Sequence, residues 1–288
     1  MFTTFAKRLI PPSLHPAARQ ARDGFALTTR RLARRLRPGT FQLPPAAVAE
    51  VRRRLGRAPA NLAVSRDDQM YAILVRAYGP DRAAVEYLTS GHGIFADLSA
   101  VVAAHFGGWD QIGSYVDFAA GHGRLTRWLL AERAGNRIWV SDVKPDAVRF
   151  QQRQFGVQGF VSATRPADLR APRPFDCVTV TSLFTHLPDR TFAPWLGRLL
   201  SLVNPGGLLA FTTRPRGDKP DDFTFVPESE ETILANGVRY TLPVYDYGAA
   251  YVSERYVAGA LASLGVTRHE FRPLGLCGFQ DLYLVTPP

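Results

Sequence analysis

The second half of the chain alternates short β-branched or aromatic runs with helical patterns. Five runs have the composition of strands: SYVDF (114–118), RIWVS (137–141), GFVSA (159–163), FDCVTVT (175–181) and GGLLAFTT (206–213). The first three are separated by RLTRWLLAER and PDAVRFQQRQF, which have helical spacing, whereas the next crossover, TRPADLRAPRP, is rich in proline and leaves room for only a turn or two of helix. This alternation is typical of a parallel sheet with helices on both faces.

Two further runs close the chain. TRHEFRPL and FQDLYLVT predict an antiparallel hairpin at one edge of the sheet. The expected fold is therefore α/β, a three-layer α/β/α sandwich around a mostly parallel sheet of seven strands. Before the hairpin, residues 214–233 are polar and lack regular periodicity, which predicts a long, functional loop at the sheet edge.

Helical spacing also marks the residues ahead of the sheet. AAVAEVRRRLGR and the stretch 67–88 both have apolar positions on one helical face. We expect a basic helical N-terminal extension over 1–60, a helical lead-in or lid over 61–110, and the α/β core over 111–288.

Charge is distributed unevenly along the chain. The first 60 residues hold thirteen Lys and Arg but two acids, so the net charge of +10 arises ahead of the core. This disfavours a nucleic-acid groove on the core, which needs clustered cations near its site. A basic amphipathic helix can dock on an anionic membrane or an acidic partner. An ordinary packed helix with solvated arginines and a transit-type peptide remain alternatives.

The cellular location of the protein can be predicted from its apolar runs and its cysteines. No run of about 18 apolar residues is present, and the first residues lack the long apolar stretch of a secretory signal. We expect a cytoplasmic protein, with peripheral membrane contact as an alternative. The two cysteines, Cys177 and Cys277, are expected to be reduced thiols.

The segment VDFAAGHGRLTR carries the first chemical signal. Asp117 ends a predicted strand, and Gly121 and Gly123 stand just before a predicted helix, where backbone N–H groups can approach a polar ligand. The next strand ends in Asp142, in the place where an acid can bind both ribose hydroxyls of an adenosine cofactor. A surface acid or helix N-cap is the structural alternative for Asp142. A dinucleotide site would have a third glycine where Thr126 stands, and it does not expect Asp117.

These segments resemble successive motifs of class I, Rossmann-like S-adenosylmethionine-dependent methyltransferases of the bacterial general methyltransferase-domain type. The resemblance runs from about residue 88 to 284 through VDFAAGHGRLTR, SDVKPDAV, FDCVTVTSLFTHLPD and LVNPGGLLAFTT. It departs at Ala119, which replaces the first glycine of the usual loop and therefore should have a negative φ. The resemblance implies S-adenosylmethionine as cofactor and the following binding residues: Asp117, Ala119, Gly121, His122, Gly123, Asp142, Val143, Ala163, Thr164, Thr181, Ser182 and Leu183. Asp168 could reach the adenine amino group, but a turn-capping role is preferred.

A candidate base and an acceptor pocket follow the fourth strand. His186 is expected at the carboxyl edge of the sheet, either as a base that takes a proton from the acceptor or as a structural residue bonded to the backbone. The pocket is expected to include Phe184, Tyr245, Tyr247 and Tyr251, with a packed aromatic face as the alternative. Neither His122 nor His186 has metal ligands at the usual spacing, so no metal is expected.

The acceptor class is narrowed by missing patterns. Amino-methylating DNA enzymes have an Asp or Asn, two prolines and an aromatic residue where Thr181-Ser182-Leu183-Phe184 stands, and cytosine C5 enzymes need a Pro-Cys nucleophile there. We therefore expect methylation of a hydroxyl or amine on a small molecule or glycan. An NAD-dependent oxidoreductase and a non-catalytic methyltransferase-like binding module stay as alternatives.

Overall fold

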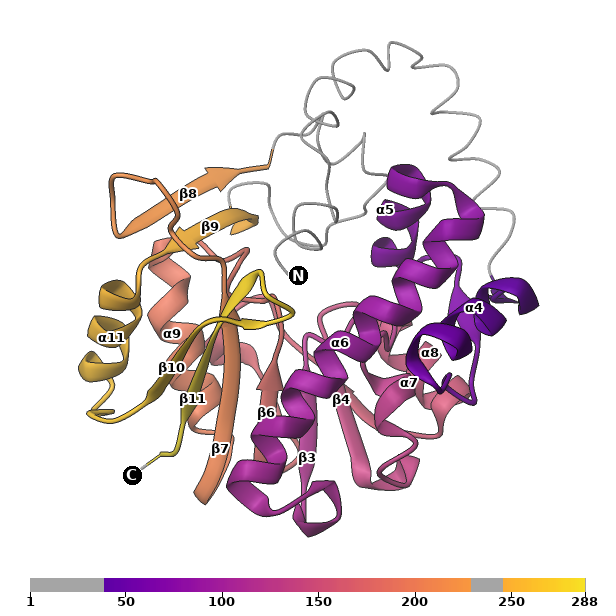
Figure 1. The fold of residues 1–288 in the computed structure, drawn as a ribbon. Helices are drawn as coiled ribbons and strands as arrows, with labels where there is room; N and C mark the ends of the chain where they lie inside the picture. The colour runs from indigo at the N-terminus through magenta and orange to yellow at the C-terminus, as the bar shows by residue number, and fades with distance from the viewer. Residues whose placement is uncertain (1–38, 229–245, 288) are drawn as a thin grey trace. The chain divides into compact units, whose positions relative to one another are not determined.

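The computed structural model describes residues 39–228 and 246–287, which divide into two compact units (Figure 1). The described residues of the first unit are 39–89, and those of the second are 90–228 and 246–287. Residues 1–38, which carry most of the basic extension, and the predicted pocket residue Tyr245 lie outside the described residues. The expected division into 1–60, 61–110 and 111–288 remains a prediction.

The first unit is mainly helical. Its elements are the antiparallel strands β1 (Thr40–Gln42) and β2 (Ala63–Ser65), the helices α4 (Pro45–Leu55) and α5 (Gln69–Tyr78), and the first part of α6 (Pro80–Phe106). Helix α4 begins at a proline, which fits the first helical position, and ends at the left-handed Gly56. Asp68 caps α5 by accepting a hydrogen bond of 3.1 Å from the Tyr71 N–H. The helical stretch expected at 67–88 is broken at Gly79, because its left-handed φ of 78° and the following proline end α5.

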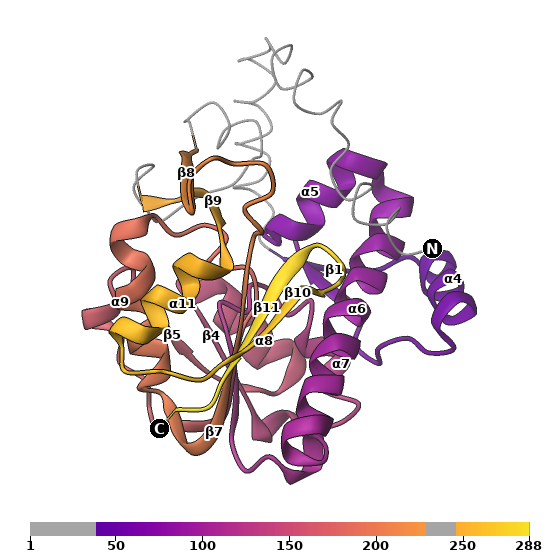
Figure 2. The same ribbon diagram turned by 60° about the vertical axis from the view of Figure 1, so that its left-hand side comes forward.

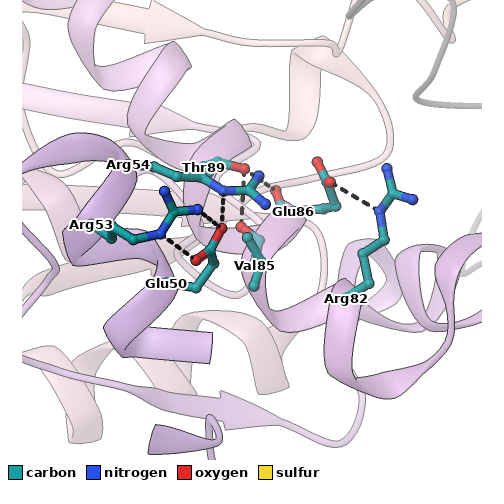
Figure 3. Close-up of polar contacts among 7 residues, drawn as sticks. All are labelled: Glu50, Arg53, Arg54, Arg82, Val85, Glu86 and Thr89. Atoms are coloured by element: carbon teal, nitrogen blue, oxygen red, sulfur yellow. Dashed lines mark hydrogen bonds and ion pairs between the residues drawn. The ribbon is translucent and has the colours of Figure 1, made fainter. Parts of the chain in front are cut away.

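Arginines of the first unit are partly neutralised by acids on the same helices (Figure 3). The Glu50 carboxylate accepts hydrogen bonds from Arg53, at 2.7 and 2.9 Å, and from Arg54, at 2.6 Å. These bonds lower the pKa of Glu50 to about 2. Farther along the chain, Arg82 pairs with Glu86 at 3.3 Å. The exposed pairs of Glu50 stabilise the helix little, so this part of α4 is a solvated, ion-paired helix face.

The second unit contains one seven-stranded sheet in the order β10-β11-β7-β6-β3-β4-β5 (Figures 1 and 2). The strands are β3 (Tyr115–Phe118), β4 (Ile138–Asp142), β5 (Gln158–Val161), β6 (Phe175–Val180), β7 (Val203–Thr213), β10 (Glu270–Leu276) and β11 (Gln280–Val285). The first five pair in parallel, and β11 is antiparallel both to β7 and to β10. The predicted parallel sheet with a terminal edge hairpin is confirmed.

Helices cover both faces of this sheet (Figures 1 and 2). Helices α7 (Thr126–Leu129) and α8 (Pro145–Phe155) lie on one face with the later part of α6, and α9 (Asp189–Leu200) and α11 (Glu254–Ser263) lie on the other. The proline-rich crossover forms only the 3₁₀ turn η3 (Pro166–Asp168), as expected, and the remaining 3₁₀ turns are η1 (Trp109–Gln111) and η2 (Gly135–Arg137). The helix predicted over RLTRWLLAER is shorter than expected, because α7 ends at Leu129. Beyond it, backbone hydrogen bonds of the i→i+3 type appear, as from the Ala131 N–H to Trp128 O.

The prediction of an irregular loop over residues 214–233, after β7, is also partly wrong. Its residues form β8 (Phe223–Pro227), which pairs antiparallel with β9 (Gly248–Val252) in a separate two-stranded sheet. Alternating buried and half-buried positions along β9 explain the strand. The two cysteines are free thiols, with Cys177 buried in β6. In the described part of the chain, no helix is both long enough and apolar enough to cross a membrane.

Candidate functional site

Four parallel strands bring the sequence motifs to one edge of the sheet. The glycine loop follows β3, Asp142 ends β4, the segment from Thr181 follows β6, and Arg214 follows β7. Because the strands are parallel and adjacent, their carboxyl ends meet at the same edge. Ligands of open α/β sheets bind at this edge, next to the point where the strand order reverses, which here lies between β3 and β6.

Asp142 is joined directly to the glycine loop. One carboxylate oxygen accepts the Gly121 N–H at 2.8 Å, and the other accepts the Lys144 N–H at 2.9 Å. The N-cap of α8 is Lys144 and Asp142 is buried, so Asp142 is neither the helix N-cap nor the surface acid of the structural alternative. Each carboxylate oxygen has a further lone pair, which leaves Asp142 able to accept from a ligand hydroxyl.

The two glycines of the loop have different surroundings. Both have left-handed φ values, 56° at Gly121 and 80° at Gly123. A Cβ at Gly123 would collide with Phe155 and with Gln151 Oε1, 2.9 Å away, so that glycine lets the loop pack on α8. A Cβ at Gly121 would meet no atom within 4 Å, so the loop is open there. The open glycine is the one whose N–H group Asp142 holds.

Ala119 corrects a sequence expectation. Its φ is 61°, in the left-handed region, whereas the sequence predicted a negative φ. Its side chain packs partly on the hydrophobic core, which accounts for an alanine being held there. A non-glycine residue in this region carries strain of about 1–3 kcal/mol, and such strain gathers at functional loops.

Asp117 is a buried acid beneath the loop. It is 1% exposed, and the Thr179 hydroxyl donates to it at 3.5 Å. The Tyr115 hydroxyl in turn contacts that threonine at 2.7 Å. Burial, reinforced by the nearby negative charge of Asp142, raises the pKa of Asp117 to about 7. This carboxyl therefore changes charge close to neutral pH.

His122 belongs to the packing of the loop. It is buried, its ring meets Phe150 edge-on at 5.7 Å, and its Nε2 lies 3.5 Å from Asp146 Oδ2. The side chain therefore fastens the loop to α8. Its predicted contact with the cofactor stays a prediction.

The segment after β6 is held by a residue that sequence reasoning missed. Ser182 has a φ of 67°, and its N–H donates to the Thr212 hydroxyl at 2.9 Å. Gln280, at the start of β11, donates from Nε2 to the Ser182 hydroxyl at 2.9 Å and accepts from Thr212 at 2.7 Å. Thr181 and Leu183 are half-buried on either side of Ser182. A polar residue, Gln280, at the start of the run QDLYLV was the available signal.

His186 is fixed by strand β9. Its Nδ1 is 2.8 Å from Gly248 O, its carbonyl accepts the Gly248 N–H at 3.2 Å, and its ring stacks on Tyr247 at 4.5 Å. Burial, with a smaller contribution from the positive charge of Arg214, lowers the pKa of His186 to about 4. The contact with Gly248 is the kind of backbone bond that the structural interpretation of His186 expected, whereas burial is what makes the ring a weak base at neutral pH.

Phe184 does not line a pocket, which corrects its prediction as a pocket residue. Its side chain is fully buried and packs between Phe192, at 4.8 Å, and Phe211, at 5.0 Å. Apolar residues on α9 and β7 face the ring of Phe184, so the ring is part of the hydrophobic core and not of the site. Tyr247 and Tyr251 are half-buried on or next to β9.

The remaining predicted residues lie at the ends of β4 and β5. Val143 and Ala163 are half-buried, and Thr164 is exposed. Asp168 is exposed, ends η3 and pairs with the Arg165 side chain at 2.6 Å, and its turn-capping role stays a prediction. Among the residues that the structure describes, no three His, Cys, Asp or Glu side chains are grouped as a metal site.

Comparison with known proteins shows what the central part of the chain is similar to. A family model described as a methyltransferase domain matches residues 116–209. DesVI of Streptomyces venezuelae is 14% identical with a TM-score of 0.50, over 70% of this chain and 92% of that chain. DhpI, solved as a complex with SAH, is 19% identical with a TM-score of 0.50, over 77% and 96%. A comparison with curated proteins gives no match.

At these identities, the two structures establish the fold alone. The family match covers β3 to the middle of β7, the segment that carries the glycine loop, Asp142 and the residues after β6. Residues 116–209 therefore resemble a methyltransferase domain, and the sheet around them has the same fold as these two structures.

Proposed function

We propose that the protein is an S-adenosylmethionine-dependent methyltransferase that acts on a hydroxyl or amine of a small molecule or glycan. The observation that carries this proposal is the bond from the Gly121 N–H to Asp142 at the carboxyl edge of the sheet. It joins the open part of a glycine loop to an acid that retains free lone pairs. A methyltransferase-domain match over the same residues supports it.

The residues at this edge fit S-adenosylmethionine. Gly121 leaves the loop open for close approach, Asp142 can accept from the ribose hydroxyls, and ionised Asp117 would favour the methionyl ammonium. Val143, Ala163 and Thr164, at the neighbouring strand ends, would border the adenine. DhpI, which has this fold, is solved with SAH. Thr126 is fully buried where a dinucleotide loop would have its third glycine, which disfavours NAD.

For methyl transfer, the protein mainly has to align the methyl donor with the acceptor. When bound, S-adenosylmethionine supplies a methyl group on a positively charged sulfur, which an acceptor oxygen or nitrogen displaces in line. The loop after β6 and strand β9 would form the acceptor side, with Ser182 held by Gln280 and His186 held by Gly248. We assign His186 a positioning role, because its depressed pKa makes it a weak proton acceptor at neutral pH.

Product formation tests the proposal. The full chain is incubated with S-adenosylmethionine and pooled small hydroxyl and amine compounds, and SAH and methylated products are followed by mass spectrometry. Methylated product and an equal amount of SAH are expected from the wild type, with strong loss in Asp142→Ala. Cofactor binding without any methylated product would favour the non-catalytic binding module instead.

A further inference from the structure

Strand β9 is held against the edge of the sheet where the motifs meet. The Ala250 N–H donates to Thr185 O at 2.9 Å, in the segment after β6. The Val252 N–H donates to Arg214 O at 3.0 Å, directly after β7, and Val252 also bridges Pro215. The side chains of β9 are therefore fixed beside the carboxyl ends of β6 and β7, on the proposed acceptor side.

The two faces of β9 differ. Gly248, Ala250 and Val252 are buried, whereas Ala249 and Tyr251 are half-buried on the opposite face. Ala249 leaves little side chain on this face next to the Tyr251 ring. The half-buried face of the strand therefore carries one aromatic ring next to a small side chain.

Two cations converge on the Tyr251 ring. Arg214 Cζ and Lys219 Nζ each lie 5.0 Å from its centroid, so the two charges are at most twice that distance apart. Arg216 donates to Lys219 O at 2.6 Å, which folds the segment after β7 and adds a third cation to it. Both Arg214 and Lys219 are half-buried, so their charges are held in place and not spread into solvent.

No described carboxylate forms an ion pair with Arg214 or Lys219. Asp222 is taken by Arg255 and Ser253, and Asp246 by Arg190. Asp218 and Asp221 lie in the same segment, are exposed and reach neither cation at ion-pair distance.

The charge of Arg214 also acts on the site itself. After burial, it is the cause that lowers the pKa of His186. A positive charge that disfavours protonation of this ring would attract a negative group on a molecule bound there.

We infer that the methyl acceptor carries an anionic group, a phosphate or a carboxylate, which Arg214 and Lys219 bind beside the Tyr251 ring. The inference rests on the proposed function, because it takes this surface as the acceptor side. Arginine provides a planar pair of donors for the anion, and lysine adds a point charge. The ring of Tyr251 holds the two cations in place, and the uncharged part of the acceptor then extends from the anion toward the loop after β6, where its reacting hydroxyl or amine would lie.

Binding of two simple anions tests the inference. Pyrophosphate and citrate are titrated at low ionic strength into the full-length wild type, Arg214→Gln, Lys219→Gln and Arg214→Lys, with folding checked by thermal melting. The control is Arg149→Gln, which removes one exposed charge from α8, a helix packed on β4 and β5 at the other side of the sheet. Removing a charged hydrogen-bond donor should weaken binding by about tenfold or more.

The results separate the inference from the proposed function. Binding that weakens in both glutamine variants, recovers largely in Arg214→Lys and stays unchanged in Arg149→Gln supports it, and the tighter probe distinguishes phosphate from carboxylate. Absent binding, or binding that is equal in all variants, overturns it. S-adenosylmethionine is titrated into the same wild-type sample, so failure of the proposed function would appear as missing cofactor binding whatever the anions do.

Discussion

The raised pKa of Asp117 leads to a prediction on stability. In the folded chain burial raises this pKa from 3.8 to about 7, so between these values the folded state binds a proton that the unfolded state has released. Stability must therefore fall as pH rises from about 4 to about 7, and it stays reduced above that pH. A shift of this size corresponds to about 4 kcal/mol. We expect Asp117→Asn, which keeps the shape without the charge, to be more stable than the wild type at pH 8 by up to that amount.

The same carboxyl should couple cofactor binding to pH. If ionised Asp117 favours the methionyl ammonium, binding of S-adenosylmethionine requires loss of its proton below pH 7. Affinity should then fall by up to about tenfold for each pH unit between 7 and 5.5, with one proton released per molecule bound. Asp117→Asn should bind more weakly at pH 7.5 and show no such pH dependence.

Calorimetry can follow both effects. Urea unfolding at pH 5 and 8 gives the stability of each variant, and titrations in buffers of different ionisation enthalpy count the protons released. Thr179→Val serves as a second probe, since it removes the hydroxyl that bonds the carboxylate and should raise the pKa further. Equal stability of wild type and Asp117→Asn at pH 8, or cofactor affinity that is constant from pH 5.5 to 7.5 in the wild type, would refute the reasoning.

Three further experiments have defined outcomes. Ala119→Gly should stabilise the chain by roughly 1 kcal/mol in urea unfolding, because relief of left-handed strain exceeds the entropy cost of glycine; destabilisation would contradict this. The wild-type pH–rate profile should show no inflection at 6–7 from His186, whose pKa is about 4, and an inflection there that His186→Asn abolishes would restore His186 as the base. Removing the basic residues 1–60 should abolish binding to anionic vesicles at low salt, since each cation contributes about 1 kcal/mol; undiminished binding would remove the docking role.

The sheet could be predicted because its strands are short apolar runs with clear helical patterns between them. The glycine loop and Asp142 could also be placed, since strand ends in a parallel sheet determine which residues share an edge. The lengths of the helices were harder to predict from the sequence. The helix after the loop ends early because its backbone changes to i→i+3 bonds, a change that the periodicity of RLTRWLLAER does not record.

Contacts between distant segments account for the other differences. Phe184 faces the core because of Phe192 and Phe211, which lie on elements that its own sequence neighbourhood does not reveal. Gln280 reaches Ser182 only because β11 pairs with β7 next to β6. The left-handed φ of Ala119 runs against local preference, so no local rule could have predicted it.

The central claim is that Asp142 and the open glycine loop bind S-adenosylmethionine. Calorimetric titration of S-adenosylmethionine and of NADH into wild type, Asp142→Ala and Asp168→Ala tests it most directly. Loss of hydrogen bonds to a charged acceptor costs about 2–4 kcal/mol, so Asp142→Ala should bind S-adenosylmethionine on the order of 30-fold or more weakly. Asp168→Ala, whose carboxylate is exposed and paired with Arg165, should bind it as the wild type does, and NADH should not bind. Unchanged affinity in Asp142→Ala, or preferential binding of NADH by the wild type, would contradict the claim.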